Sequence, residues 1–169
     1  MEIIQTKRLI LRSLCFDDCE AAMNFWDNSN VMKYCGGACK DINQINNVLR
    51  NYTKSLNERG FSAYAVSLKD SGDVIGACGF NYTSKFDEIE LIYHFSEKYW
   101  GKGYASEASK ACIEYARKNL NVSKIIASTD PENEISGKIL KKLGFKYIGL
   151  KWFEDTHKEE RYYELNIVE

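Results

Sequence analysis

The sequence predicts a single α/β domain built on a mixed β-sheet, and three observations support this fold class. The chain has 169 residues, of which 44% are hydrophobic and 28% charged, as expected for one globular domain over residues 1–169. Apolar segments with strand and helix patterns follow one another without a linker, a repeat or a low-complexity segment. Helices alternate with strands only in the second half, which favours a mixed sheet of about seven strands with four flanking helices over a doubly wound sheet.

The first third of the chain is predicted to contain one strand and two helices. Residues 8–14, "RLILRSL", form the strand, and residues 16–28 form a helix with acidic residues near its N-terminus, where they favour the helix dipole. Residues 41–59 form the second helix, which Gly60 ends as a C-cap because glycine readily adopts the left-handed conformation.

A hairpin and a further strand are predicted next. The two strands of the hairpin, residues 61–69 and 74–82, flank the turn "DSGD". The further strand, "FDEIELIYHF" at 86–95, leads toward a turn that contains two glycines.

That turn, "WGKGYA", predicts an anion site. Gly101 and Gly103 directly precede a helix predicted over 105–120, whose apolar residues recur at the spacing of one helix face. Glycines at this point imply an unusual backbone or a close approach by another group. The N-terminus of a helix also leaves N–H groups unpaired and carries a partial positive charge, so the turn is suited to a phosphate.

The remaining elements are a strand, a helix and two closing strands. Residues 123–129 form a short buried strand, and residues 133–145 form a helix that ends at Gly144. The closing strands, residues 146–154 and 161–168, are joined by a polar loop.

Composition excludes several classes of function. The formal net charge of −1 argues against a nucleic-acid-binding protein, and no apolar run approaches the roughly 20 residues that a membrane span needs. The N-terminus lacks the layout of a signal peptide, so we expect a cytoplasmic protein. The six cysteines form no CxxC pair and only two histidines occur, so we expect reduced thiols and no metal site.

Two common phosphate-binding motifs do not fit the glycine turn. A P-loop needs a glycine five residues before Gly101, and the dinucleotide motif GxGxxG needs a glycine where this chain has Ser106. "WGKGYA" instead resembles the R/Q-x-x-G-x-G/A turn with which the GNAT acetyltransferase superfamily binds the pyrophosphate of acetyl-coenzyme A. Trp100 stands where many members have Arg or Gln.

Three further segments resemble this superfamily in the right order, so the resemblance covers nearly the whole chain. "TKRLILRSLCFDD", "EIELIYHFSEKYW" and "DPENEISGKILKKLGF" resemble the opening strand, the fourth strand and the late Asn-x-x-Ser helix of the branch that contains the ribosomal-protein N-terminal acetyltransferases. The resemblance implies the GNAT fold, with a mostly antiparallel sheet that splays at its centre. It also implies acetyl transfer from acetyl-coenzyme A to a primary amine, plausibly the N-terminal amine of a protein or peptide.

The same resemblance implies which residues bind the cofactor. The pyrophosphate would be held by backbone N–H groups of the turn and the start of the following helix; these belong to Gly101, Lys102, Gly103, Tyr104, Ala105 and Ser106. The strand backbone at Tyr93, His94 and Phe95 would bind the pantetheine arm, and Asn133 would bond a pantetheine amide. Asn133 could also act only as a helix N-cap.

Two catalytic residues are expected. Glu90 matches a carboxylate of the family's fourth strand and would act as the base, although a strand glutamate can also be a solvated or salt-bridged residue and His94 shares its strand face. Ser136 would protonate the departing thiolate, because Leu140 occupies the position where many members have a catalytic tyrosine.

The sequence is compatible with more than one class of acceptor. Acidic residues of the last loop could attract a cationic amine or a basic peptide; these are Glu154, Asp155, Glu159 and Glu160. The alternatives are a small-molecule acetyltransferase for a polyamine, amino acid or drug, and a non-catalytic acetyl-coenzyme A sensor. We expect a monomer or a homodimer.

Overall fold

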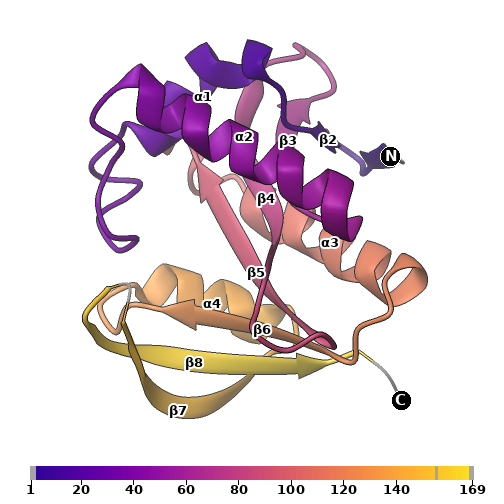
Figure 1. The fold of residues 1–169 in the computed structure, drawn as a ribbon, viewed down its shortest axis with the longest axis vertical. Coiled ribbons are helices and arrows are strands. Elements are labelled where there is room, and N and C mark those ends of the chain that lie inside the picture. The colour runs from indigo at the N-terminus through magenta and orange to yellow at the C-terminus, as the bar shows by residue number, and fades with distance from the viewer. Residues whose placement is uncertain (1–2, 155, 168–169) are drawn as a thin grey trace.

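The computed structural model describes residues 3–154 and 156–167, and these form one eight-stranded sheet with helices on both faces (Figure 1). The strands are β1 Ile4–Gln5, β2 Leu9–Ser13, β3 Ala63–Leu68, β4 Val74–Tyr82, β5 Glu88–Phe95, β6 Lys124–Thr129, β7 Lys146–Phe153 and β8 Lys158–Asn166. Their order in the sheet is β1-β2-β3-β4-β5-β6-β8-β7, and every pair is antiparallel except β5 with β6. The predicted mixed, mostly antiparallel sheet is confirmed. The predicted strand count was one short, because β1 has two residues and shows no alternating pattern.

Four α-helices flank the sheet, as predicted. They are α1 Cys19–Trp26, α2 Ile42–Arg59, α3 Tyr104–Asn119 and α4 Glu134–Lys142, and two 3-10 turns lie at Phe16–Asp18 and Glu97–Tyr99. The Asp41 side chain caps α2 at its N-terminus, and Gly60 ends this helix with a φ of 79°, which confirms the predicted C-cap.

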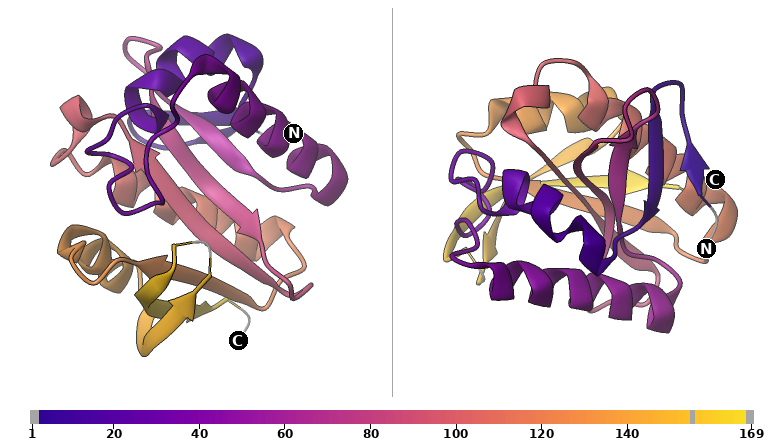
Figure 2. Two further views of the ribbon diagram at one scale, coloured as in Figure 1. Left: turned by 60° about the vertical axis from the view of Figure 1, so that its left-hand side comes forward. Right: turned by 90° about the horizontal axis from the view of Figure 1, so that it is seen from above.

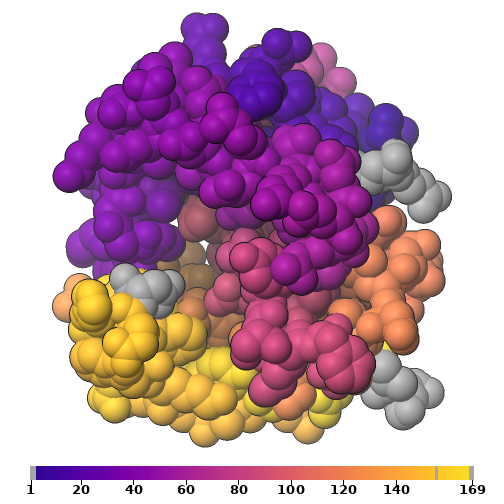
Figure 3. Space-filling model, in the orientation of Figure 1, coloured from indigo at the N-terminus to yellow at the C-terminus, as the bar shows by residue number. Residues whose placement is uncertain are grey.

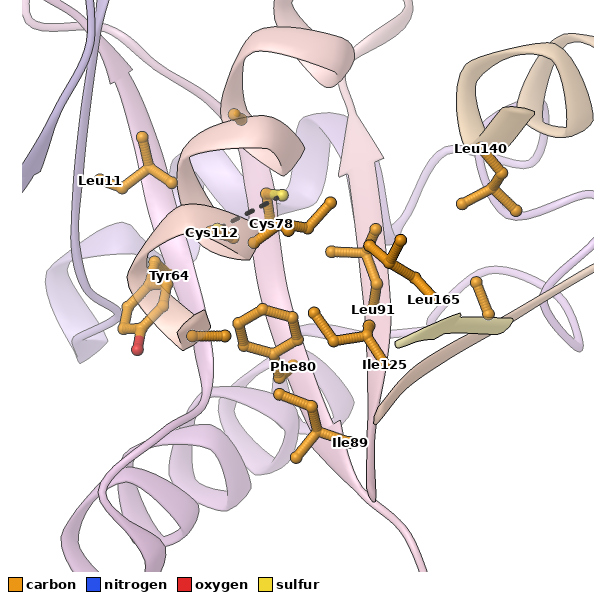
Figure 4. Close-up of a cluster of buried hydrophobic side chains, with 14 of the residues drawn as sticks. Leu11, Tyr64, Cys78, Phe80, Ile89, Leu91, Cys112, Ile125, Leu140 and Leu165 are labelled. Atoms are coloured by element: carbon orange, nitrogen blue, oxygen red, sulfur yellow. Dashed lines mark hydrogen bonds between the residues drawn. The ribbon is translucent and has the colours of Figure 1, made fainter. Parts of the chain in front are cut away.

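Each face of the sheet has its own hydrophobic core. The larger core lies between the sheet and α3 and includes Phe80 of β4 and Leu91 of β5 (Figure 4). In it the Sγ atoms of Cys78 and Cys112 lie 3.8 Å apart as free thiols. The smaller core, which includes Phe25, lies on the opposite face under α1 and α2.

The sheet divides at its centre. β5 and β6 pair only through Glu88–Glu90 and Lys124–Ile126, and beyond this point β6 continues alongside β8. The two strands therefore diverge, and Figure 2 shows the β6–β8 unit turned away from the rest of the sheet. We call this gap, beside Leu91–Phe95 of β5, the β5–β6 opening. It is the splayed sheet that the sequence predicted.

No helix in the described part of the chain is long and apolar enough to cross a membrane.

Candidate active site at the β5–β6 opening

The register of β5 decides which backbone groups face the opening. Gly76 of β4 lies opposite Phe95, and the N–H of Ser96 donates to the carbonyl of Ile75 at 2.9 Å. This pattern marks Phe95 as a non-hydrogen-bonded position of the β4–β5 ladder, so its N–H and C=O point away from β4. The two-residue repeat places Tyr93 in the same orientation and His94 in the opposite one. Tyr93 and Phe95 thus present their backbone to the opening, whereas the prediction that His94 does so is wrong, because its backbone faces β4.

The glycine turn (residues 100–103) closes one end of the opening. The indole Nε1 of Trp100 donates to the carbonyl of Phe95 at 2.7 Å, which ties the turn to the end of β5. Gly101 and Gly103 have φ values of 74° and 81°. A Cβ added at Gly101 would meet no atom within 4 Å. This glycine is therefore needed for its left-handed backbone and not for lack of space.

The helix α3 begins directly after this turn, and its first backbone N–H groups have no partner within the helix. Gly103 is its N-cap residue, and among the described residues no side chain caps the first turn. Unpaired N–H groups and the positive end of the helix dipole then face the space beside the turn, and both suit an anion such as a pyrophosphate. The residues present therefore fit the cofactor that the family resemblance implies.

Arg8, near the N-terminus of the chain, contacts the glycine turn. Its Nη1 donates to the carbonyl of Lys102 at 2.9 Å, and its Nε forms a 2.7 Å ion pair with Glu107 in the first turn of α3. Its guanidinium also lies 4.4 Å from the ring centroid of Tyr104. The other oxygen of Glu107 accepts from Thr6 Oγ1 at 2.6 Å and from the N–H of Arg8 at 2.9 Å. The motif "TKR" thus belongs to the same structural unit as "WGKGYA".

A pair of hydroxyl groups bridges β5 and α4. The Tyr93 phenol and Ser136 Oγ lie 2.6 Å apart, within hydrogen-bond distance. Burial raises the pKa of the Tyr93 phenol, and the hydrogen bond with Ser136 opposes this shift. The Asn133 side chain accepts from the N–H of Ser136 at 3.1 Å and so caps α4. The sequence singled out Ser136 but not the Tyr93 side chain, since only the fold brings this phenol to α4.

Leu140 lies in the larger core and is fully buried. The position at which the family resemblance led us to look for a tyrosine is therefore occupied here by a core residue. Leu140 cannot donate a proton, whereas the Tyr93–Ser136 pair brings two hydroxyl groups to the opening.

Glu90 lies on the opposite face of β5, toward α1 and α2. Successive strand residues point to opposite faces, so Glu90 and Ile92 share one face and Leu91 lies on the other. Ile92 packs against the smaller core, whereas Leu91 packs in the larger core. The Glu90 carboxylate is half-buried and accepts a hydrogen bond from Asn81 Nδ2 at 3.3 Å. Glu88 shares this face and forms a 3.1 Å ion pair with Lys85.

His94 is poorly placed to act as a base. Trp26 Nε1 donates to His94 Nδ1 at 3.3 Å, which leaves the proton of the neutral imidazole on Nε2. Burial lowers the pKa of His94 to about 4, so the ring is uncharged at neutral pH. Neither nitrogen of this tautomer is free to take a proton, and Glu90 remains the better candidate base.

A hollow opens on the Glu90 face of the molecule. Figure 3 shows it between the segment of residues 28–40 that follows α1 and the β7–β8 hairpin, with β5 beside it. On the same face, Tyr52 of α2 packs against the smaller core and stacks on Trp26; burial raises the pKa of this phenol to about 12, and the charge of Glu90 adds to the shift. The sequence did not identify Tyr52 because it lies in the middle of a polar helix.

The predicted acidic rim is only partly turned toward this hollow. Glu154 and Glu159 are exposed, Glu160 is buried, and Asp155 lies outside the described residues. Within the described ranges, no three His, Cys, Asp or Glu side chains gather closely enough to hold a metal ion.

Comparison with known proteins agrees with this geometry. Residues 8–146 match the family model described as an acetyltransferase (GNAT) domain. The chain is 32% identical over 152 residues to the N-acetyltransferase p20 of Bacillus licheniformis, covering 89% of this chain and 85% of that protein. The crystal structure of a GNAT-family acetyltransferase from Bacillus anthracis superimposes with a TM-score of 0.85 and 28% identity, covering 98% of this chain and 99% of that one. A shorter match, 33% identical over 82 residues (47% of this chain and 42% of the relative), is to the ribosomal protein uS5-alanine N-acetyltransferase of Escherichia coli.

Proposed function

Because the chain belongs to the acetyltransferase (GNAT) family, we propose that it transfers an acetyl group from acetyl-coenzyme A to a primary amine by direct attack within a ternary complex. The acceptor that the sequence motifs and the uS5-alanine relative favour is the N-terminal amine of a protein or peptide. The single observation that carries the proposal is the β5–β6 opening, with the free α3 N-terminus at one end, the Tyr93–Ser136 pair on one face and Glu90 on the other.

Binding of acetyl-coenzyme A uses backbone groups of this chain. The N–H groups from Gly101 to Ser106 hold the pyrophosphate, and the backbone of Tyr93 and Phe95 pairs with the pantetheine arm as a further strand would. Asn133 Oδ1 already caps α4, which leaves its Nδ2 to donate to a pantetheine amide. The thioester then lies in the opening, between Glu90 and Ser136.

The attack requires an uncharged amine and a stabilised oxyanion. An α-amine has a pKa of about 8 and is partly neutral at physiological pH, so Glu90 needs to remove one proton, directly or through a water molecule. The N–H of Phe95 points into the opening and donates to the oxygen of the tetrahedral intermediate. A donor of this kind contributes about 2.7–4 kcal/mol of transition-state stabilisation.

Collapse of the intermediate breaks the carbon–sulfur bond and releases a thiolate, which takes up a proton. Ser136 Oγ donates that proton, Tyr93, 2.6 Å away, restores it to Ser136, and the Tyr93 phenolate takes up a proton from water before the next turnover. The raised pKa of Tyr93 keeps its phenol protonated and available for this relay.

Release of coenzyme A across a panel of short peptides with free N-termini, polyamines and amino acids tests the proposal. Amine-dependent release by the native chain, lowered at least about 10²-fold in a Glu90→Gln variant, is the expected result. Equal release with and without amine, or tight binding of acetyl-coenzyme A with no turnover on any amine, would refute amine transfer. The second of these results would favour a sensor of acetyl-coenzyme A.

A further inference from the structure

Three carboxylates of the central strands and the loop after β6 have a cation of their own. Glu88 pairs with Lys85 at 3.1 Å, Glu164 pairs with Lys124 at 3.0 Å, and Asp130 contacts Lys158. Such pairing is expected, since a carboxylate removed from water is costly without a compensating charge or hydrogen bonds.

Glu160 differs from these carboxylates. Its residue is only 5% exposed, and its Oε1 accepts a hydrogen bond from Thr156 Oγ1 at 2.8 Å. In the described part of the chain, no group donates to Oε2 and no cation lies within ion-pair distance of this carboxylate. Lys151 lies opposite Glu160 in the β7–β8 ladder, but its ammonium lies 3.3 Å from the ring centroid of Tyr162.

The position of Glu160 on β8 directs it toward the hollow. Glu160 and Tyr162 lie two residues apart and so share one face of the strand. In the ladder Glu90 lies beside Ile126 of β6, and Ile126 lies beside Glu164 of β8, so Glu164 and the residues that alternate with it, Tyr162 and Glu160, lie on the Glu90 side of the sheet. Burial raises the pKa of Tyr162 to about 12, and the charges of Glu88, Glu164 and Glu90 add to the shift, as this placement implies.

Cys35 belongs to the segment of residues 28–40 that borders the hollow in Figure 3. Part of the residue is exposed, yet desolvation raises the pKa of its thiol to about 11, and the charge of Glu160 adds more than that of any other carboxylate. Glu90 and Asp130 also act on this thiol. Glu160 on β8 and Glu90 on β5 therefore lie on the same face of the sheet, the face on which the hollow opens.

We propose that Glu160 binds a second cationic group of the acceptor, so that the preferred acceptor is an amine that carries another positive charge. This inference rests on the proposed amine transfer and identifies the class of acceptor. Glu90 faces the amine that reacts, which has to lose its charge, whereas Glu160 faces a group that keeps its charge. Lys151 and Lys158 are its neighbours on the hairpin, but Lys151 lies over the Tyr162 ring and Lys158 pairs with Asp130, so within the described residues Oε2 keeps room for a charge-assisted hydrogen bond. An ammonium on a diaminoalkane or the side chain of a basic residue in a peptide supplies the same chemistry.

A comparison of matched acceptors tests the proposal. The native chain is assayed for coenzyme A release with a diaminoalkane and the monoamine of equal chain length, and with peptides that carry lysine or norleucine beside the N-terminal residue. The dicationic member of at least one pair is expected to have the lower KM. Glu160→Gln should raise that KM about tenfold or more, as the loss of one charge-assisted hydrogen bond implies, and leave the monocationic acceptor unchanged. Which pair responds distinguishes a small diamine from a basic peptide.

Glu159→Gln is the matched control, because this neighbouring residue is exposed and lies on the other face of β8. Binding of the diaminoalkane and the lysine peptide in the presence of coenzyme A, measured by calorimetry, provides a readout that does not need turnover. Equal KM values within both pairs, or equal effects of the two glutamine variants, would overturn the role of Glu160 while amine transfer stands. Charge-dependent binding without turnover would support Glu160 and refute the transfer reaction. If the native chain showed no turnover and no binding of either acceptor, both the amine transfer and the role of Glu160 would be overturned.

Discussion

Replacing Arg8 with alanine tests how the glycine turn is held in the shape that binds pyrophosphate. The change removes the 2.9 Å hydrogen bond to the carbonyl of Lys102 and the 2.7 Å ion pair with Glu107. It also removes the cation from the Tyr104 ring. Glu107 keeps its hydrogen bonds to Thr6 Oγ1 and to the N–H of residue 8, so no buried charge is left without a partner.

The magnitude follows from these contacts. Hydrogen bonds to charged groups contribute about 1.5–3 kcal/mol each. The Arg8 side chain is 40% exposed, so solvent reduces each contact here to about 1 kcal/mol. Two contacts then amount to about 2 kcal/mol, and if they order the turn for its ligand, the Kd for acetyl-coenzyme A rises roughly 30-fold.

Calorimetric Kd values and steady-state kinetics measure this effect. KM for acetyl-coenzyme A should rise with Kd, and kcat at saturating acetyl-coenzyme A should change little, because Arg8 touches no reacting atom. Lys7→Ala removes an exposed neighbouring cation and serves as the control for net charge. An unchanged Kd in Arg8→Ala, or an equal rise in both variants, would refute the reasoning. A fall in kcat by the same factor as the rise in KM would also refute the reasoning.

Three further predictions concern the same site. Ser136→Ala and Tyr93→Phe should each lower kcat at least tenfold with little change in the Kd for acetyl-coenzyme A, and rapid-quench measurement of the chemical step checks this. Gly101→Ala places a side chain at a φ of 74°, which costs about 1–2 kcal/mol and should weaken binding of acetyl-coenzyme A; a Gly60→Ala variant, with a similar φ far from the turn, is the control for stability. The pKa of His94 is lowered from 6.5 to about 4 in the folded state, so its contribution to stability is present above pH 6.5 and is lost as the pH falls toward 4. The unfolding temperature should fall less steeply over this range in a His94→Gln variant.

Local features of the site were predictable from the sequence because they depend on neighbouring residues. The left-handed glycines before α3 and the Gly60 cap of α2 are imposed by backbone sterics, which act within a few residues. The alternation that places Glu88 and Glu90 on one face of β5 is likewise a property of a single strand. The order of the four family motifs also predicted the cofactor and the splayed sheet.

Pairings between distant segments were not predictable in the same way. Arg8 and Glu107 are separated by 99 positions, and Tyr93 and Ser136 by 43, so no periodicity connects them. Their contacts depend on where the strands pair and where β5 leaves β6. The same register turns the backbone of His94 toward β4, although its neighbours face the opening.

The sequence by itself determined the fold class, the left-handed glycine turn and the identity of the candidate base, since each follows from local conformation or a contiguous motif. Only the tertiary structure decided which hydroxyl lies beside Ser136, which residue anchors the turn and which glutamate of the last loop points inward. Glu159 and Glu160 look alike in the sequence, yet one is exposed and the other is 5% exposed. The physical reason is that burial and charge pairing depend on surfaces that distant segments bring together, and those surfaces exist only in the folded chain.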